Sequence, residues 1–426
     1  MTSGTDDARL AWAMWALPAL LFLFAFFHRV APGVMARDLM QAFGASGALL
    51  GLLSATYFYA YAAGMIPAGV LIDAYGTRRV VAGGGAVMGA GTLLMGLATG
   101  TPGLFAGRLL VGLGATVTFV GALKVAATWF AASRFGFLSA VTATVGIVGA
   151  LVATAPLAAL ISLAGWRMAF VLVGVVTVAG AVACLLALRD RPAGTAAEAP
   201  PSLRAALAGT RAVLRNPHTW PPFLAFFCLY SAMGNLQLWV VPYLRDVYGM
   251  SNTEAAVYAA APSLALIVSG PLTGFLSDRV LRRRKAPYLA LNVGLLVLWA
   301  LFVATLGALP PWGVYLVLLG MGGVGGAYVL TWPIGREVNP PHLAGIAVAV
   351  VNLGGFLGAA LTQAPLGAVL DARWAGTLVE GARSYPADAY HVAFTVCAAF
   401  VLGAAVLSLL LRETRGQNVY AEAARR

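Results

Sequence analysis

The sequence predicts an all-α membrane protein with twelve transmembrane helices arranged as two pseudo-symmetric six-helix bundles. Three observations predict this class: the apolar composition, the regular spacing of apolar runs, and a motif repeated half a chain apart. The 426 residues are 61% hydrophobic and only 10% charged, with a mean hydropathy of +0.86. Soluble domains carry about 25% charged residues, so a single core surrounded by water is excluded.

Apolar runs close to the ~20 residues that cross a bilayer recur along the whole chain. Each half of the chain contains six of them. We expect spans at residues 11–35, 47–70, 79–99, 104–127, 136–162, 168–188, 221–243, 254–276, 287–307, 313–335, 345–369 and 390–411. Because six is an even number, the two halves insert with the same orientation, and the axis that relates them lies along the membrane normal.

A spaced motif occurs once in each half. The first copy of G-x-x-G-A-x4-A-P-L begins at Gly146, and the second begins 209 positions later at Gly355. Two shorter matches have nearly the same displacement: Arg37-Asp38 with Arg245-Asp246, and Gly69-x3-Asp73 with Gly274-x3-Asp278. Duplicated bundles are typical of secondary transporters, whose substrate site lies between the repeats.

The repeat predicts three parts, namely a six-helix bundle at 1–188, a cytoplasmic linker at 189–220, and a second six-helix bundle with a cytoplasmic tail at 221–426. The linker begins with a stretch rich in Pro, Ala and Gly. Leucines and arginines then follow on two neighbouring helical faces: Leu203, Leu207 and Leu214, and Arg204, Arg211 and Arg215. We expect either a short amphipathic helix on anionic lipid or an ordered linker without a lipid role.

Basic residues are distributed unevenly between the two membrane sides. Twenty of the 27 Lys and Arg residues fall on the side that holds both termini, and five fall on the other side. Because Lys and Arg mark the cytoplasmic face, we expect both termini in the cytoplasm and the chain in the bacterial inner membrane. The net charge of +12 follows from this topology, whereas nucleic-acid binding needs a soluble basic surface.

The loop between the second and third spans carries a recognisable motif. Residues 69–79, G-V-L-I-D-A-Y-G-T-R-R, resemble the major facilitator superfamily signature G-x3-D-[R/K]-x-G-x-[R/K]-[R/K]. Ala74 departs from it, and the second copy lacks the turn glycine. The segments R-x3-G-x-G from Arg108 and W-R-x-x-F from Trp166 also resemble this family. The resemblance implies its twelve-helix fold and gating roles for Gly69, Asp73, Gly76, Arg78, Arg79, Arg108, Gly274, Asp278 and Arg279.

Ionisable groups at membrane depth are costly to bury and are usually functional. Arg29 lies nine residues inward from Asp38, or about 13 Å along a helix, which is near mid-depth in a core about 30 Å thick. The 208-residue displacement puts Gln237 at the corresponding place in the seventh span. A guanidinium suits a carboxylate or phosphate, so we expect Arg29 to bind substrate. The alternative to substrate binding is that Arg29 pairs structurally or snorkels outward.

Other polar side chains are further candidates for substrate binding. They are His28, Tyr57, Tyr61, Asn235, Tyr328, Trp332, Asn352 and Lys124. The alternative role of Lys124 is to snorkel to the headgroups. The alternative role of Asn352 is to form a hydrogen bond with a neighbouring helix. The three cysteines lie in three different spans, so neither a disulfide framework nor a zinc site is expected. No cofactor is expected either.

All fifteen acidic residues fall in loops, tails or the ends of spans. No carboxylate at mid-depth can therefore bind a cationic drug. We expect a transporter of a small anionic or zwitterionic solute, such as an organic acid or amino acid, working as a monomer by alternating access. Proton symport through His28 is an option.

The alternative function is a drug or lipid exporter with a mainly apolar cavity. An enzyme is disfavoured because no catalytic or metal-ligand set converges, and a receptor is disfavoured because no sizeable extramembrane domain exists.

Overall fold

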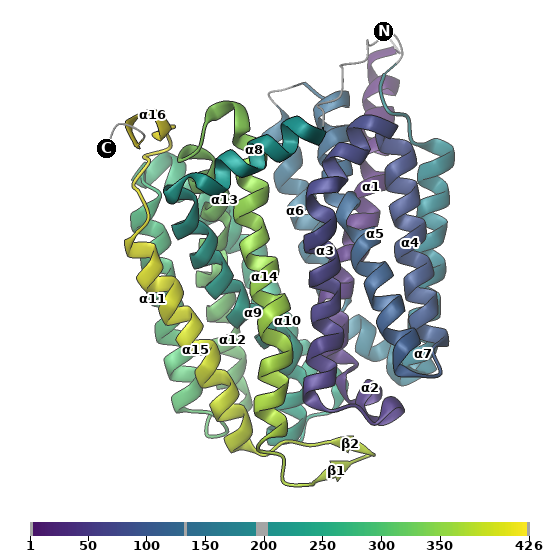
Figure 1. Ribbon diagram of the computed structural model, residues 1–426. Helices are drawn as coiled ribbons and strands as arrows, with labels where there is room; N and C mark the ends of the chain where they lie inside the picture. Colours follow the sequence, from purple (N-terminus) through teal and green to yellow (C-terminus); the bar gives the residue numbers. More distant parts are fainter. Residues whose placement is uncertain (1–2, 132–133, 193–202, 424–426) are drawn as a thin grey trace. The chain divides into compact units, whose positions relative to one another are not determined.

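Most of the described residues are helical, and they group into two compact units (Figure 1). The computed structural model describes residues 3–131, 134–192 and 203–423. Unit 1 comprises residues 1–31 and 56–203, and unit 2 comprises residues 32–55 and 204–426. Residues 32–55 thus belong to the first sequence repeat but make their contacts within unit 2. The linker's predicted Pro-rich part covers residues 192–201, and all of it after Pro192 lies outside the described residues.

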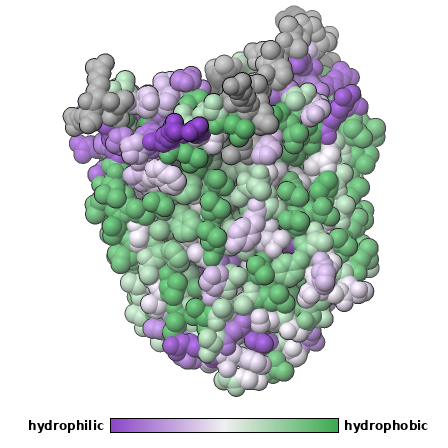
Figure 2. Space-filling model, viewed as in Figure 1, coloured by the Kyte–Doolittle hydropathy of each residue, from purple (hydrophilic) through white to green (hydrophobic). Residues whose placement is uncertain are grey.

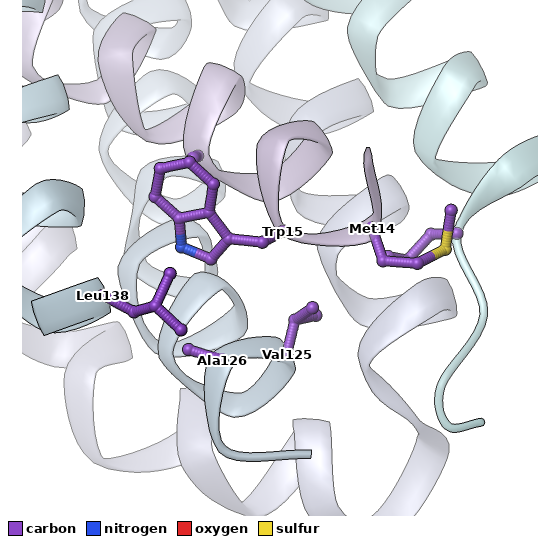
Figure 3. Packing of buried hydrophobic residues seen from close by; sticks show 7 residues of the cluster. Met14, Trp15, Val125, Ala126 and Leu138 are labelled. Carbon is purple, nitrogen blue, oxygen red and sulfur yellow. The ribbon is translucent and has the colours of Figure 1, made fainter. Parts of the chain in front are cut away.

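Unit 1 is built on the first seven helices except α2. Their bounds are α1 Ser3–Val34, α3 Gly47–Tyr75, α4 Thr77–Leu97, α5 Thr101–Trp129, α6 Phe135–Val152 and α7 Ala155–Ala187, with α1 and α3 each entering unit 2 at one end. Helix α4 packs against both α5 and α7. Figure 3 shows part of the core, where Trp15 of α1 lies beside Val125 and Leu138. The indole of Trp15 donates a hydrogen bond to the Thr142 hydroxyl at 3.1 Å.

One apolar stretch of unit 1 is too long for a single crossing. Residues 137–187 form one of eleven apolar helical stretches in the described part of the chain, and this one has 51 residues. A straight helix of that length would extend about 76 Å, against a hydrocarbon core of about 30 Å. Gly165, with φ 78°, breaks α7 into two helices. The stretch therefore holds two spans, and the twelve predicted helices are confirmed.

Unit 2 contains the remaining elements. They are α2 Ala36–Phe43, α8 Leu203–Arg215, η2 Pro217–Thr219, α9 Trp220–Tyr248, α10 Asn252–Phe275, η3 Leu276–Leu281, α11 Lys285–Ala304, α12 Pro311–Gly325, η4 Gly326–Leu330, α13 Thr331–Glu337, η5 Pro341–Leu343, α14 Ala344–Asp371, β1 Leu378–Val379, β2 Ala382–Arg383, α15 Ala387–Leu409 and α16 Tyr420–Ala423. Helix α9 packs against α14 and α15. The antiparallel hairpin pairs Leu378 with Arg383 and contacts α2 through β2.

The duplicated glycine motif makes the same contact in each unit. A methyl group on Gly149 of α6 would lie 2.1 Å from the carbonyl oxygen of Leu23 in α1. A methyl group on Gly358 of α14 would lie 2.3 Å from the carbonyl oxygen of Phe227 in α9. Only glycine permits so close an approach of two helix backbones. The repeat seen in the sequence therefore encodes one helix contact used twice.

The surface follows the pattern of a bilayer-spanning bundle. Figure 2 shows hydrophobic residues over most of the helical body and hydrophilic residues gathered near the helix ends. Large apolar side chains such as Leu186 and Val297 are 74% and 61% exposed in the structure. Lipid tails, rather than water, suit such a surface.

Substituting Gly358 tests this helix contact directly. We expect Gly358→Ala to lower the melting temperature of the detergent-purified protein, because overpacking costs about 1–3 kcal/mol. Gly345→Ala in the same helix is the matched control, since nothing lies within 4 Å of the added methyl group. Equal melting temperatures for the two variants would contradict the proposed role of the motif.

Candidate functional site

Arg29 lies in a cluster of aromatic rings within unit 1. Its guanidinium carbon is 3.9 Å from the centre of the Phe26 ring and 5.0 Å from that of Tyr61. Its Nε donates a hydrogen bond to the Tyr57 hydroxyl at 3.3 Å. Tyr57 and Tyr61 stack one turn apart on α3, with ring centres 5.8 Å apart. The structure therefore brings together three of the predicted site residues.

Arg108 also lies close to Tyr57. Its guanidinium carbon is 4.9 Å from the centre of the Tyr57 ring, and Nη1 donates to the carbonyl oxygen of His28 at 2.7 Å. Arg108 is fully buried, and its Nε and Nη2 have no hydrogen-bond partner among the described residues. Sequence analysis placed Arg108 with the gating residues, but the structure places it in the Arg29 cluster.

Gly112 explains why α5 comes so close to Tyr57. A methyl group on Gly112 would lie 2.6 Å from the carbonyl oxygen of Tyr57. Gly112 is four residues, about one turn, after Arg108. The R-x3-G-x-G segment thus supplies both the cation and the small residue that lets this cation reach the tyrosine.

His28 faces α4 and forms a hydrogen bond to Thr92. The Thr92 hydroxyl donates to the carbonyl oxygen of Met88 at 2.8 Å, so its single hydrogen is already used. It can therefore only accept from His28 Nε2, which lies 3.0 Å away. This network assigns the imidazole proton to Nε2. The buried Nδ1 has no partner among the described residues.

A second cluster of predicted residues lies in unit 2. Tyr328 meets Trp332 edge to face with ring centres 5.5 Å apart, and it stacks on Phe226 at 6.4 Å. The Trp332 indole donates to Asn352 Oδ1 at 3.0 Å. Tyr328, Trp332 and Asn352 are all partly buried. This cluster offers aromatic faces and one amide.

The remaining predicted binding residues lie outside these two clusters. Asn235 donates to Thr362 at 2.8 Å and so links α9 to α14. The backbone of Gln237 lies against Gly33, and its predicted position opposite Arg29 stays a prediction. Lys124 pairs with Asp73 at 2.8 Å. Lys124 is sixteen residues after Arg108, or about 24 Å along α5, so it is remote from the Arg29 cluster.

The first copy of the loop motif forms a sharp turn. Gly76 has φ 86°, and a methyl group there would lie 2.6 Å from a carboxylate oxygen of Asp190. That carboxylate accepts from the backbone nitrogen of Arg78 at 2.7 Å. Arg79 is exposed, and nothing lies within 4 Å of a methyl group on Gly69. The gating roles stay predictions, and Asp190 is a partner that sequence analysis missed.

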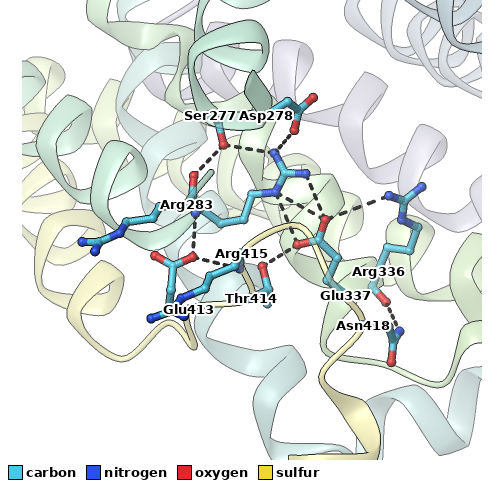
Figure 4. Close-up of polar contacts among 10 residues, drawn as sticks. Ser277, Asp278, Arg283, Arg336, Glu337, Glu413, Thr414, Arg415 and Asn418 are labelled. Atoms are coloured by element: carbon cyan, nitrogen blue, oxygen red, sulfur yellow. Dashed lines mark hydrogen bonds and ion pairs between the residues drawn. The ribbon is translucent and has the colours of Figure 1, made fainter. Parts of the chain in front are cut away.

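The second copy of the loop motif is organised around Arg284, whose partners Asp278 and Glu337 are labelled in Figure 4. Its guanidinium binds Asp278 and the buried carboxylate of Glu337, with Nη2 3.0 Å from Oε1. Burial lowers the pKa of Arg284, but its hydrogen bonds and charge pairing with Glu337 and Asp278 outweigh burial and raise it overall. Arg279 is exposed, and no described atom lies within 4 Å of a methyl group on Gly274, so neither residue shows a comparable contact in the described part of the chain.

Two features form the turn in the second copy of the loop motif, which lacks the turn glycine. Arg282 adopts the left-handed conformation with φ 49° and ψ 40°, whereas Gly76 in the first copy has φ 86° and ψ 149°. Glu413, from the segment after α15, accepts hydrogen bonds from the backbone nitrogens of Arg284 and Lys285 at 2.7 and 3.2 Å. The start of α11 is thereby capped by the chain's C-terminal segment.

A third polar group, the α2–α3 clasp, lies within unit 2. We define it as the carboxylates of Asp246 and Asp371 with their partners. Asp371, the last residue of α14, accepts from the backbone nitrogens of Gly47 and Ala48 at 2.9 and 2.8 Å. It also accepts from Arg383 at 2.9 Å and the Tyr385 hydroxyl at 2.7 Å. The N-terminus of α3 is therefore held by a charge on the second repeat.

Asp246 forms the other half of the clasp. It binds Arg37 of α2 at 2.6 Å and accepts from the Tyr390 hydroxyl at 2.7 Å. The repeated Arg-Asp dipeptide thus supplies an arginine from one repeat and an acid from the other. Burial raises the pKa of Asp38, and the charge of Arg245 opposes that rise. Arg37 therefore attracts Asp246, and Arg245 attracts Asp38, so each dipeptide supplies one cation and one anion to the other.

Comparison with known proteins gives consistent results. The sequence profile of the Major Facilitator Superfamily matches residues 19–363. The probable sulfoacetate transporter SauU of Cupriavidus necator is 27% identical over 62% of this chain, and the chain spans 64% of that relative's length. The probable galactarate/D-glucarate transporter GudP of Bacillus subtilis is 24% identical over 84% of this chain and 86% of its own.

Solved structures share the fold. The bacterial homolog to the human lysosomal transporter Spinster, in its inward-facing and occupied conformation, superposes with a TM-score of 0.76 at 19% identity. That superposition covers 93% of this chain and 96% of the other. A point mutant of the nucleoside transporter NupG gives a TM-score of 0.74 at 15% identity, covering 94% and 99%.

The two copies of the loop motif should differ in their contribution to stability. Removing one partner of a buried ion pair costs about 3–5 kcal/mol, whereas an exposed pair contributes about 0–1 kcal/mol. Glu337 is 3% exposed, but Lys124 and Asp73 are 45% and 24% exposed. We therefore expect Glu337→Gln to lower the melting temperature strongly and Asp73→Asn to change it little. A larger effect of Asp73→Asn in the same thermal assay would contradict this assignment.

Proposed function

The chain belongs to the Major Facilitator Superfamily, and we propose that it is a secondary transporter that carries a small organic anion by alternating access. The observation that carries the substrate class is the pair of arginines around Tyr57. Arg108 contributes two buried nitrogens, Nε and Nη2, without a partner among the described residues, and a bound anion would satisfy their N–H groups. The guanidinium carbon of Arg29 lies 5.9 Å from the centre of the same ring. Two guanidinium groups in a low-dielectric region favour negative charge.

The acidic residues support the same class, because none falls at mid-span in the sequence. A zwitterionic amino acid would need an acceptor for its ammonium group, whereas a carboxylate or sulfonate needs only donors. The relatives' names agree, since they refer to sulfoacetate, galactarate or D-glucarate, and nitrate or nitrite. We therefore favour an organic anion over an amino acid.

The alternative, an exporter of apolar compounds, is favoured by the aromatic cluster in unit 2. Phe226, Tyr328 and Trp332 present ring faces rather than charges. In that case Arg29 and Arg108 would be structural. Uptake assays with carboxylates and sulfonates, compared with dye efflux, separate the two functions.

Topology and coupling belong to the same proposal. The excess of Lys and Arg on the side of the termini supports cytoplasmic termini in a bacterial inner membrane, with the monomer as the working unit. His28 is the titratable group of the Arg29 cluster, and uptake with and without an imposed pH gradient tests whether a proton is coupled.

The α2–α3 clasp supports alternating access. Secondary transporters with repeats work by moving one repeat against the other around the site. Gly47 and Arg37 belong to the first repeat by sequence, whereas Asp371 and Asp246 belong to the second. We propose that the clasp closes the outer side of the transporter in one state and opens in the other.

Replacing Arg29 tests the anion site. We expect Arg29→Gln to abolish or greatly weaken uptake of the anionic substrate, because a hydrogen bond to a charged group contributes about 1.5–3 kcal/mol. Arg29→Lys should restore uptake only partly, since an ammonium lacks the planar two-point contact. Uptake into proteoliposomes is the measurement.

The exposed Arg373 supplies the matched control, because Arg373→Gln removes one charge outside the cluster. Its uptake should equal that of the unmodified protein. If Arg29→Gln transports the anion normally, or if the substrate proves to be a cation, the exporter of apolar compounds becomes the better function.

The clasp predicts a change in accessibility at Ala45, which is 7% exposed between α2 and α3. Asp371→Asn removes the charge that holds α3, at a cost of about 1.5–3 kcal/mol. In the Ala45→Cys background, we expect a membrane-impermeant maleimide added outside to react at least about tenfold faster, since 1.4 kcal/mol is one factor of ten. Asp388→Asn, whose carboxylate is 66% exposed, should leave the rate unchanged. Equal rates in both variants would exclude the clasp as an outer gate.

A further inference from the structure

Helix α8 has two opposite faces of different character. One face is packed on unit 2, where Val213 is fully buried with Phe223 and Val350. A methyl group on Gly209, one turn earlier, would lie 2.6 Å from Ile346 of α14. In Figure 1, α8 lies crosswise over the beginning of α14. The helix is therefore fixed to the protein along the Gly209–Val213 side.

The opposite face mixes apolar and cationic side chains. Leu207 and Leu214 are 54% and 39% exposed, and they lie seven residues apart on one side of the helix. Arg211 and Arg215 are exposed on the adjoining stripe. Helix α8 contains no acidic residue. Neither Arg211 nor Arg215 has an ion-pair partner in the described part of the chain.

The exposed face of α8 continues into the start of α9, and two hydrogen bonds at this junction fix the orientation of α8. Trp220, at the start of α9, is 40% exposed, and its indole donates to the carbonyl oxygen of Leu214 at 3.1 Å. The Thr219 hydroxyl donates to the carbonyl oxygen of Val213 at 2.9 Å. Tryptophan is enriched where a transmembrane helix leaves the hydrocarbon. The end of α8 is thereby held at the expected depth of the headgroups.

We propose that Leu207, Arg211, Leu214 and Arg215 form a binding surface for anionic phospholipid of the cytoplasmic leaflet. The leucines suit the boundary between headgroups and acyl chains, and the arginines suit the lipid phosphates. An apolar ridge beside cations that lack an ion-pair partner among the described residues fits this partner better than it fits water. The surface rests on the proposed topology of the transporter, and it adds a lipid partner that the Arg29 site does not involve.

The charge of the surface predicts its selectivity. Each basic residue near an anionic membrane strengthens binding about fivefold. Arg211→Gln/Arg215→Gln should therefore weaken binding of phosphatidylglycerol about 25-fold, measured by titrating the lipid onto the purified full-length protein. Arg282→Gln/Arg283→Gln removes two exposed arginines from another loop and should leave this affinity unchanged.

A fluorophore on Leu207→Cys tests the position of the face. Cys184 and Cys397 are buried, and Cys228→Ala removes the remaining, partly exposed thiol. In nanodiscs with phosphatidylglycerol, we expect quenching by brominated acyl chains and protection from an aqueous quencher. In nanodiscs of phosphatidylcholine alone, or with Arg211→Gln/Arg215→Gln, the label should become accessible to water.

Three outcomes would overturn the proposal. They are equal accessibility in both lipids, equal protection in both lipids, or protection that appears only when a soluble acidic protein is added. Labelling of Leu207→Cys from outside intact cells would instead show that the proposed topology is wrong. Anion uptake through the Arg29 site in phosphatidylcholine vesicles is measured separately, so its loss there would count against the proposed function rather than against the lipid surface.

Discussion

Close contact between helix backbones is the constraint on which the rest of this structure depends. In hydrocarbon, apolar side chains gain little by meeting each other rather than lipid, so helices associate through small residues that let backbones approach. Gly149, Gly358 and Gly112 all lie against carbonyl oxygens of neighbouring helices. The last of these contacts brings Arg108 to Tyr57, so the candidate anion site depends on it directly.

The hydrocarbon also restricts where charged side chains can lie. Asp246, Asp371 and Glu337 lie at helix ends, where they pair with cations or with backbone nitrogens. The arginines Arg29 and Arg108 contact aromatic rings, a hydroxyl and a carbonyl oxygen. Rings and carbonyl groups stabilise a guanidinium without neutralising it. A site of this kind keeps its positive character for a ligand that arrives and leaves.

The fold could be predicted from sequence because span length, charge bias and repeated motifs are local or periodic signals. The Arg29 cluster could be predicted only in part. Depth along a helix follows from residue counts, so the sequence predicts that Arg29 lies near mid-depth. The direction of the Arg108 side chain depends on how α5 packs against α3, so the sequence does not place Arg108 beside Tyr57. The clasp was missed for a related reason. Sequence analysis found both Arg-Asp dipeptides, but no spacing rule indicates that Asp371 caps α3.

Three acids of the two repeats lie where their own helices disfavour them. Asp73, Asp246 and Asp371 each fall in the last turn of a helix, beside the negative end of its dipole. Each is therefore stabilised by a partner from elsewhere: Asp371 by the start of α3, Asp246 by Arg37, and Asp73 by Lys124. A transporter needs its two states nearly equal in free energy, because a few kcal/mol would leave one state almost empty. In the proposed alternating-access cycle, breaking the clasp is offset by interactions that form on the proposed cytoplasmic side. Asp73, whose gating role the family resemblance implies, has the matching chemistry, since a carboxylate at a helix N-terminus would replace the one that Asp371 supplies to α3.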